Sequence, residues 1–149
     1  MNLKASILTY STPYTMTIDN NLLANLLRQA QLSPRLRQSH DLRNSAEDQS
    51  QRMLNALLPG TELPIHRHPT TSESVFLLHG RMDEVFFDNN GQETARIQLD
   101  PSQGIYGVQI PQGTWHTVEV FQPSVIVEMK AGSYQPITPQ DILQPHETL

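Results

Sequence analysis

Residues 60–80 read GTELPIHRHPTTSESVFLLHG, two short apolar runs on either side of a proline turn. In a strand, residues two apart point to the same side, so His66 and His68 aim both imidazoles at one point. Pro69 ends the first run. Glu73 begins the second, from which its carboxylate can lie beside the histidine pair. The stretch therefore predicts two strands with a polar site between them.

A third imidazole is available from residues 111–116, which read PQGTWH. The proline and glycine of this run predict a tight turn before a strand, and the turn would present His116 to the same site. Three imidazoles and one carboxylate suit a divalent first-row metal ion such as Fe, Mn, Ni, Co or Zn, and leave coordination positions for a ligand. The predicted metal ligands are His66, His68, Glu73 and His116.

Around these runs the sequence predicts a mainly β fold. Leucines at helical spacing predict a helix from about Asp19 to Ala30, with Asp19 as N-cap. Pro34 ends it, and we interpret residues 34–51 as an extended, solvated connection. Short β-branched and aromatic runs then alternate with Gly, Pro and Asn, as in a double-sheet jelly roll. The predicted strands are Arg52–Leu58, Glu62–His66, Ser74–His79, Met82–Asp88, Glu93–Leu99, Gly107–Ile110, Trp115–Phe121 and Val125–Lys130.

Composition narrows the classes of partner. The 149 residues include no Cys, which excludes thiolate metal sites and disulfides. A net charge of −5 argues against nucleic acid and anionic membranes as partners, and no apolar run approaches the ~18 residues of a membrane span. We expect one cytoplasmic protein with a helix and connecting segment (1–45), a barrel (46–133) and a C-terminal tail (134–149).

The two runs resemble the motifs of the cupin superfamily. The first motif is matched in spacing by Gly60, His66, His68, Glu73 and Gly80, and the end of the second by Pro111, Gly113 and His116. Two departures occur in the second motif: Gly104 lies one residue too far before Pro111, and Val120 stands where the motif has Asn. The resemblance implies a cupin double-stranded β-helix with a metal ion inside the barrel.

A narrower resemblance, to the WbuC family of small cupin-fold metalloproteins, covers nearly the whole chain. It rests on residues 33–37, 51–60, 66–69 and 108–117. WbuC-like proteins tend to occur beside genes for surface-polysaccharide sugars, so the resemblance implies a bacterial metal-binding cupin linked to polysaccharide biosynthesis and nucleotide-sugar chemistry. It implies no particular reaction.

Two arginines are candidates for ligand binding. Arg35 and Arg37 follow the helix and precede the core strands, so their segment can fold back over the barrel mouth. Guanidinium groups there would hold the carboxylate or phosphate of an anionic ligand. The alternative is a solvated connection. Trp115 and Tyr106 are candidates for the pocket wall, although aromatic residues in strands are more often core.

Three residues are candidates for a general base near the metal: Tyr106, Glu62 and His79. Glu62 also has the same strand parity as His66, which makes it the alternative carboxylate ligand if Glu73 points away.

The function indicated is metal-dependent handling of a small polar, sugar-derived ligand. As an isomerase or epimerase the protein would use the metal as a Lewis acid. A small iron dioxygenase and a non-catalytic metal-dependent sensor are the alternatives. Because open jelly-roll sheets expose strand edges, we also expect a homodimer, with the run Lys4 to Thr9 as an added strand.

Overall fold

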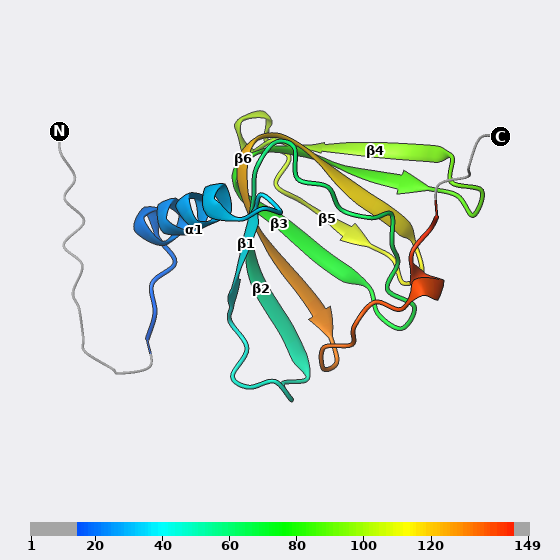
Figure 1. Ribbon diagram of the computed structural model, residues 1–149, viewed down its shortest axis with the longest axis horizontal. Coiled ribbons are helices and arrows are strands. Elements are labelled where there is room, and N and C mark those ends of the chain that lie inside the picture. The colour runs from blue at the N-terminus through cyan, green and yellow to red at the C-terminus, as the bar shows by residue number, and fades with distance from the viewer. Residues whose placement is uncertain (1–14, 145–149) are drawn as a thin grey trace.

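The structure, a computed structural model, describes residues 15–144 (Figure 1). Its elements are α1 (Asn20–Leu32), β1 (Arg37–Asp41), β2 (Ser50–Leu57), β3 (Glu73–Phe87), β4 (Glu93–Leu99), η1 (Pro101–Gln103), β5 (Gly107–Ile110), β6 (Trp115–Ala131) and η2 (Pro139–Asp141). Within this part of the chain no helix is long and apolar enough to span a membrane.

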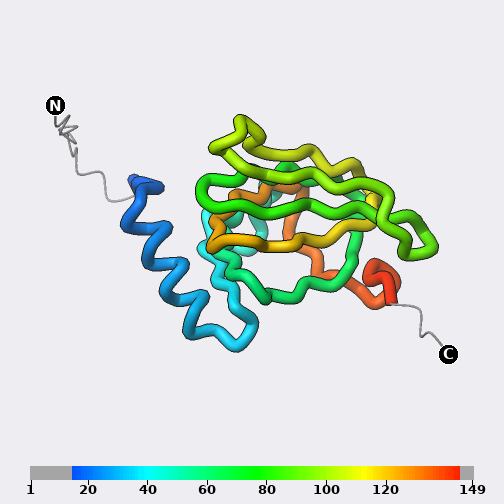
Figure 2. The backbone as a smooth tube through the Cα atoms, turned by 90° about the horizontal axis from the view of Figure 1, so that it is seen from above, coloured from blue at the N-terminus to red at the C-terminus, as the bar shows by residue number. Residues whose placement is uncertain are grey.

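Helix α1 begins and packs much as its sequence predicts. The Asp19 carboxylate accepts a hydrogen bond from the backbone N–H of Leu22 at 3.0 Å, so Asp19 is the N-cap. Leu26 and Ala30 are buried against the outer face of the sheet, where they join the cluster that contains Leu54 and Val125. Figure 2 shows α1 lying to one side of the stacked strands.

Two long strands, β3 and β6, run through both layers of the fold. The first layer has the order β1-β2-β6-β3-β5 and the second β6-β3-β4, with all pairs antiparallel. Between the layers lies one apolar core, formed by Leu57, Val75, Leu77, Met82, Phe86, Leu99, Ile110, Val120 and Ile126. The predicted double-sheet β architecture is confirmed.

The prediction of separate strands on either side of Gly80 and Pro123 is wrong. The two strands predicted around Gly80 form one bent strand, β3, and the two predicted around Pro123 form one bent strand, β6. Both are continuous because the β3–β6 ladder runs on through register shifts near Gly80. Gly80 has φ of 101°, and a Cβ there would collide with the Pro123 carbonyl and the Ser124 hydroxyl. The motif glycine therefore lets β3 pass from one layer to the other.

Two further strand predictions are wrong. Residues 37–41, interpreted as part of a solvated connection, form β1 and pair with β2. Residues 62–66 make only two isolated bridges, both at His66, to His116 and to Ile142, since Pro64 lacks the donor that a continuous ladder needs. The run Lys4 to Thr9 lies outside the described residues, and the homodimer stays a prediction that light scattering can test.

Candidate metal centre

The backbone holds His66 and His116 side by side. The N–H of His66 donates to the His116 carbonyl at 3.0 Å, and the N–H of His116 donates to the His66 carbonyl at 2.9 Å. His116 lies near the start of β6, whereas His66 lies in the connection before β3. Two residues 50 positions apart are thereby fixed as neighbours by main-chain hydrogen bonds.

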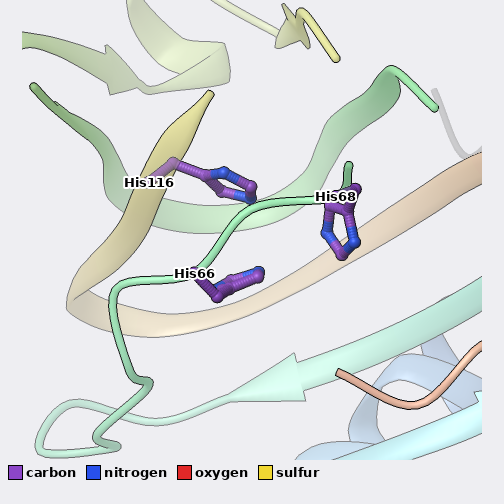
Figure 3. Close-up of side chains that lie close together, drawn as sticks. All are labelled: His66, His68 and His116. Carbon is purple, nitrogen blue, oxygen red and sulfur yellow. The ribbon is translucent and has the colours of Figure 1, made fainter. Parts of the chain in front are cut away.

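The three motif histidines form one cluster. The ligand atoms of His66, His68 and His116 all lie within 4.8 Å of one another, and Figure 3 shows the three rings gathered in one place. The ring centroids of His66 and His116 are 4.3 Å apart, and those of His66 and His68 are 5.1 Å apart. The structure thus shows the predicted cluster of three imidazoles.

Backbone carbonyls orient two of the rings. Nδ1 of His66 lies 2.9 Å from the Pro64 carbonyl and Nδ1 of His116 lies 2.8 Å from the Thr114 carbonyl. A carbonyl only accepts, so each Nδ1 carries a hydrogen, and Nε2 is the nitrogen left to bind a metal ion. Burial, and next the neighbouring His116, lowers the pKa of His66 to about 4, so its ring is neutral at pH 7.

Glu73, at the start of β3, completes the cluster. Its side chain is only 4% exposed, and Oε2 lies 3.0 Å from Nε2 of His68 and 3.3 Å from Nε2 of His116. Burial acts to raise the pKa of Glu73, but His116, His68 and Lys130 outweigh it and hold that pKa below its usual range. The carboxylate is therefore anionic where the imidazoles converge.

The polar atoms at this point fit a metal ion. Oε2 of Glu73 and Nε2 of His68 are both buried, and neither has a properly directed hydrogen bond to another group in residues 15–144. Imidazole nitrogens and a carboxylate oxygen that converge on one point form the kind of ligand set that a divalent transition-metal ion takes. His66, His68, Glu73 and His116 are the residues that would hold it.

Lys130 and Glu128 extend the polar site along β6. Nζ of Lys130 lies 3.8 Å from Oε1 of Glu73 and 3.9 Å from Oε2 of Glu128. Both residues share the inward face of the strand with the core residue Ile126. Burial, and then the charge of Glu73, raises the pKa of Glu128 to about 7, although Lys130 opposes the shift.

A further carboxyl, that of Glu84, lies inside the barrel. Glu84 is only 2% exposed and shares the inward face of β3 with Met82 and Phe86. Its Oε2 has no hydrogen-bond partner among the groups the structure describes. Burial first, and then Glu73 and Glu128, raise the pKa of Glu84 well above its usual range.

The two arginines predicted to bind a ligand have different environments. Arg35 is exposed, and its backbone carbonyl accepts a hydrogen bond from the Thr61 hydroxyl at 2.7 Å. Arg37 is half-buried, pairs with the core residue Leu57 across β1 and β2, and has a buried Nε without a partner within residues 15–144. Burial and Arg35 lower the pKa of Arg37, and Glu128 raises it, which marks Glu128 as the anion that acts on this guanidinium.

The structure does not bring the other predicted site residues to the cluster. Tyr106 is 61% exposed, and the side chains of Glu62 and His79 are exposed as well. Trp115 is buried, but its indole N–H donates to Asn89 at 3.0 Å and its ring lies 4.4 Å from the Arg67 guanidinium. Adjacent strand residues face opposite ways, so Trp115 packs against the β3–β4 hairpin while His116 points into the barrel.

Sequence reasoning missed Glu84, Glu128 and Lys130. A usable signal was present, because Glu84 alternates with apolar Met82 and Phe86, and Glu128 follows Ile126 by two residues. A charged residue in phase with a core face is a candidate for the interior.

Solved structures confirm the cupin fold. A cupin 2 domain-containing protein from Halorhodospira halophila is 15% identical, with a TM-score of 0.55, over 68% of this chain and 68% of that chain. CapF with the inhibitor 3-isopropenyl-tropolone is 23% identical, with a TM-score of 0.52, over 60% of this chain and 26% of that chain. Oxalate decarboxylase from Bacillus subtilis, which has Mn(II) centres, is 19% identical, with a TM-score of 0.54, over 68% and 27%.

The chain thus corresponds to about a quarter of the CapF and oxalate decarboxylase chains. The sequence matches no curated protein, and the narrower resemblance to the WbuC family stays a prediction. One family model matches residues 18–99, which is more than half of the chain and includes His66, His68 and Glu73 but not His116. The chain therefore belongs to the family described as a domain of unknown function, DUF6016.

Proposed function

We propose that this protein binds one divalent first-row transition metal ion through His66, His68, Glu73 and His116 and uses the site to hold a small anionic ligand. The observation that carries the proposal is the convergence of three imidazoles and a buried carboxylate on one point. Fe, Mn, Ni, Co and Zn all suit this ligand set. The Mn(II) centres of a structure with the same fold support such an ion.

The charges around the cluster favour an anion as the ligand. A divalent ion with Glu73 as its anionic ligand leaves one positive charge, and Lys130 adds another beside it. Arg37, on the inward face of β1, adds a third positive charge, and within residues 15–144 the charge of Glu128 acts against it. The positive charges thus exceed the negative ones, and an excess of positive charge in a poorly solvated interior is stabilised by a negative ligand. The resemblance to WbuC favours a sugar-derived ligand, and these charges favour one that carries an acidic group.

The reaction class we propose is isomerisation or epimerisation. A bound divalent ion supplies polarisation of a carbonyl oxygen. Glu128 would take up and return a proton, because it lies beside Lys130 at the cluster and burial raises the pKa of its carboxyl toward the neutral range in which a general base acts best. This assigns to Glu128 the role that the sequence offered to Tyr106, Glu62 or His79.

Metal analysis tests the site. Purified protein that is stripped with EDTA and then reloaded with a divalent metal should hold about one metal ion per chain, as measured by elemental mass spectrometry. His116→Ala should lose the ion, whereas His79→Ala, which alters an exposed histidine away from the cluster, should retain it. A wild-type protein that retains no divalent ion would overturn the proposal.

Proton exchange tests the reaction class separately from metal binding. Pyruvate is a small keto acid whose methyl protons exchange with D2O on enolisation, and proton NMR follows the loss of signal. The metal-loaded protein should accelerate the exchange, and Glu128→Gln should abolish the acceleration while it keeps the metal. A loaded protein that binds pyruvate without exchange would support the sensor alternative instead.

A further inference from the structure

The interior of the barrel is built in layers of inward-facing residues. One layer holds His116, Glu73 and Lys130, since Glu73 pairs with Lys130 in one sheet and contacts His116 of the other. We call it the metal layer. The next layer inward holds Glu128, two positions from Lys130 along β6, and Glu84, which pairs across the strands with Val118, two positions beyond His116; we call these two residues the carboxyl layer.

Strand register places the carboxyl layer directly beneath the metal layer. Glu84 pairs with Val118, which is two residues beyond His116, and Glu128 pairs with Val75, which is two residues beyond Glu73. Two residues along a strand span about 7 Å, a distance that a glutamate side chain and a small ligand together can bridge. Glu84 in one sheet and Glu128 in the other therefore form the floor of the candidate metal site.

Glu84 is difficult to explain as a structural residue. It lies among Met82, Phe86, Val118 and Ile97, where an apolar side chain would pack without loss. A buried carboxyl without a hydrogen-bond partner is costly, and ionisation would increase the cost. Glu73 already supplies the anionic ligand of the site, so the neutral, hydrogen-bearing form of Glu84 is favoured beneath it.

We propose that Glu84 is a further ligand-contacting residue of this site, a carboxyl that donates its O–H to an oxygen atom of an anionic ligand held at the metal. The ligand class is a small hydroxy or keto acid, which can offer one oxygen atom to the metal and another to Glu84. The inference rests on the proposed function, because the metal centre must hold the ligand above the carboxyl layer.

Glycolate is a suitable probe, since it is a small ion with both a carboxylate and a hydroxyl oxygen, and ethylene glycol is its uncharged counterpart. In protein loaded with Co(II), the visible absorption of the metal reports binding. The wild type should bind glycolate and not ethylene glycol. Infrared difference spectra should show the carbonyl band of a protonated carboxylic acid that shifts when glycolate is added.

Two substitutions separate the hydrogen bond from the fold. Glu84→Met removes the donor at similar length and should weaken glycolate binding about tenfold or more, with unchanged metal content. Glu84→Gln, which preserves the shape, should remove the shifting infrared band. Glu119→Gln, at a half-exposed carboxylate on the outward face of β6, is the matched control and should change neither readout.

Several results would overturn the inference. One is that Glu84→Met binds glycolate at wild-type affinity. Another is that the carboxylic acid band does not shift on addition of glycolate, or that it persists in Glu84→Gln. A third is that the metal-loaded wild type does not bind glycolate. Loss of metal from Glu84→Met would also overturn it, because the residue would then support the metal shell. A wild type that binds no metal would instead contradict the proposed function.

Discussion

His66 and His116 exchange two backbone hydrogen bonds, at 3.0 and 2.9 Å, so their rings are placed by the main chain. The Pro64 and Thr114 carbonyls then orient the rings through Nδ1. A site whose side chains are positioned by main-chain pairing and oriented by hydrogen bonds to backbone carbonyls is preorganised to bind a metal ion.

The first prediction concerns the metal-free protein. Chelation should leave the chain folded, with unchanged far-ultraviolet circular dichroism, because main-chain contacts position the imidazoles. Added metal should stabilise the wild type by about 2.7 kcal/mol at a concentration one hundred times the dissociation constant. Thermal melts should show no such gain for His116→Ala. Unfolding of the wild type by EDTA would contradict this view.

The second prediction is a pH dependence of the metal-free fold. The pKa of His66 is about 4 in the folded chain, against an ordinary value of 6.5. Between these values the unfolded chain binds more protons, so the free energy of unfolding falls as the pH drops from 6.5 to 4. The contribution of His66 to that fall is at most about 3 kcal/mol.

Glu84 and Glu128 have raised pKa values, so their protonation makes the free energy of unfolding rise as the pH drops. The effect of His66 is therefore measured as the difference between the wild type and a variant without this histidine. Urea denaturation of the chelated wild type and of His66→Asn should give curves of stability against pH that diverge between pH 6.5 and 4. Parallel curves would show that His66 is not titrating in that range.

The third prediction concerns the bend at Gly80. Gly80→Ala adds a Cβ that collides with Pro123 and Ser124 at a φ of 101°, so the variant should lose about 3–5 kcal/mol of stability. Gly132→Ala is the control, because Gly132 has a φ of 81° and nothing within 4 Å of an added Cβ. It should lose only about 1–2 kcal/mol. Equal losses would mean that positive φ alone explains the glycine.

The histidines of the candidate metal site were predictable because their signal is local. His66 and His68 follow the two-residue period of an extended chain, and the turn before His116 is encoded in a few residues. Their meeting in space depends on strand pairing, which the motif spacing implied and the structure confirms.

Other parts of the fold were not predictable from such local signals. The edge strand β1 reads RQSHD, without apolar alternation, and it forms because β2 offers it a partner. Glycine or proline marks both a bend and the end of a strand, so the sequence around Gly80 does not distinguish the two. The continuity of β3 through Gly80 is set by its ladder with β6. Glu84 was overlooked because glutamate is rarely buried.

The last prediction separates the two arginines. Arg37→Gln should weaken glycolate binding by the metal-loaded protein about tenfold or more, because a charge-assisted hydrogen bond contributes about 1.5–3 kcal/mol. Arg35→Gln should have a smaller effect, since its exposed guanidinium acts through solvent and is screened by salt. The double variant should combine both losses, and its remaining affinity should depend less on ionic strength. Metal content should stay at the wild-type level in all three proteins, as neither arginine is a ligand.

Arg28→Gln is the matched control, because it removes the same charge from the exposed face of α1 and should leave glycolate affinity unchanged. Titrations of Co(II)-loaded protein at two salt concentrations would measure all four variants. If Arg37→Gln bound glycolate as tightly as the wild type, the positive charge that holds the anion would have to come from Lys130 and the metal alone. If it lost the metal instead, the guanidinium would be supporting Glu128 and Lys130 within the barrel, and its role would be structural.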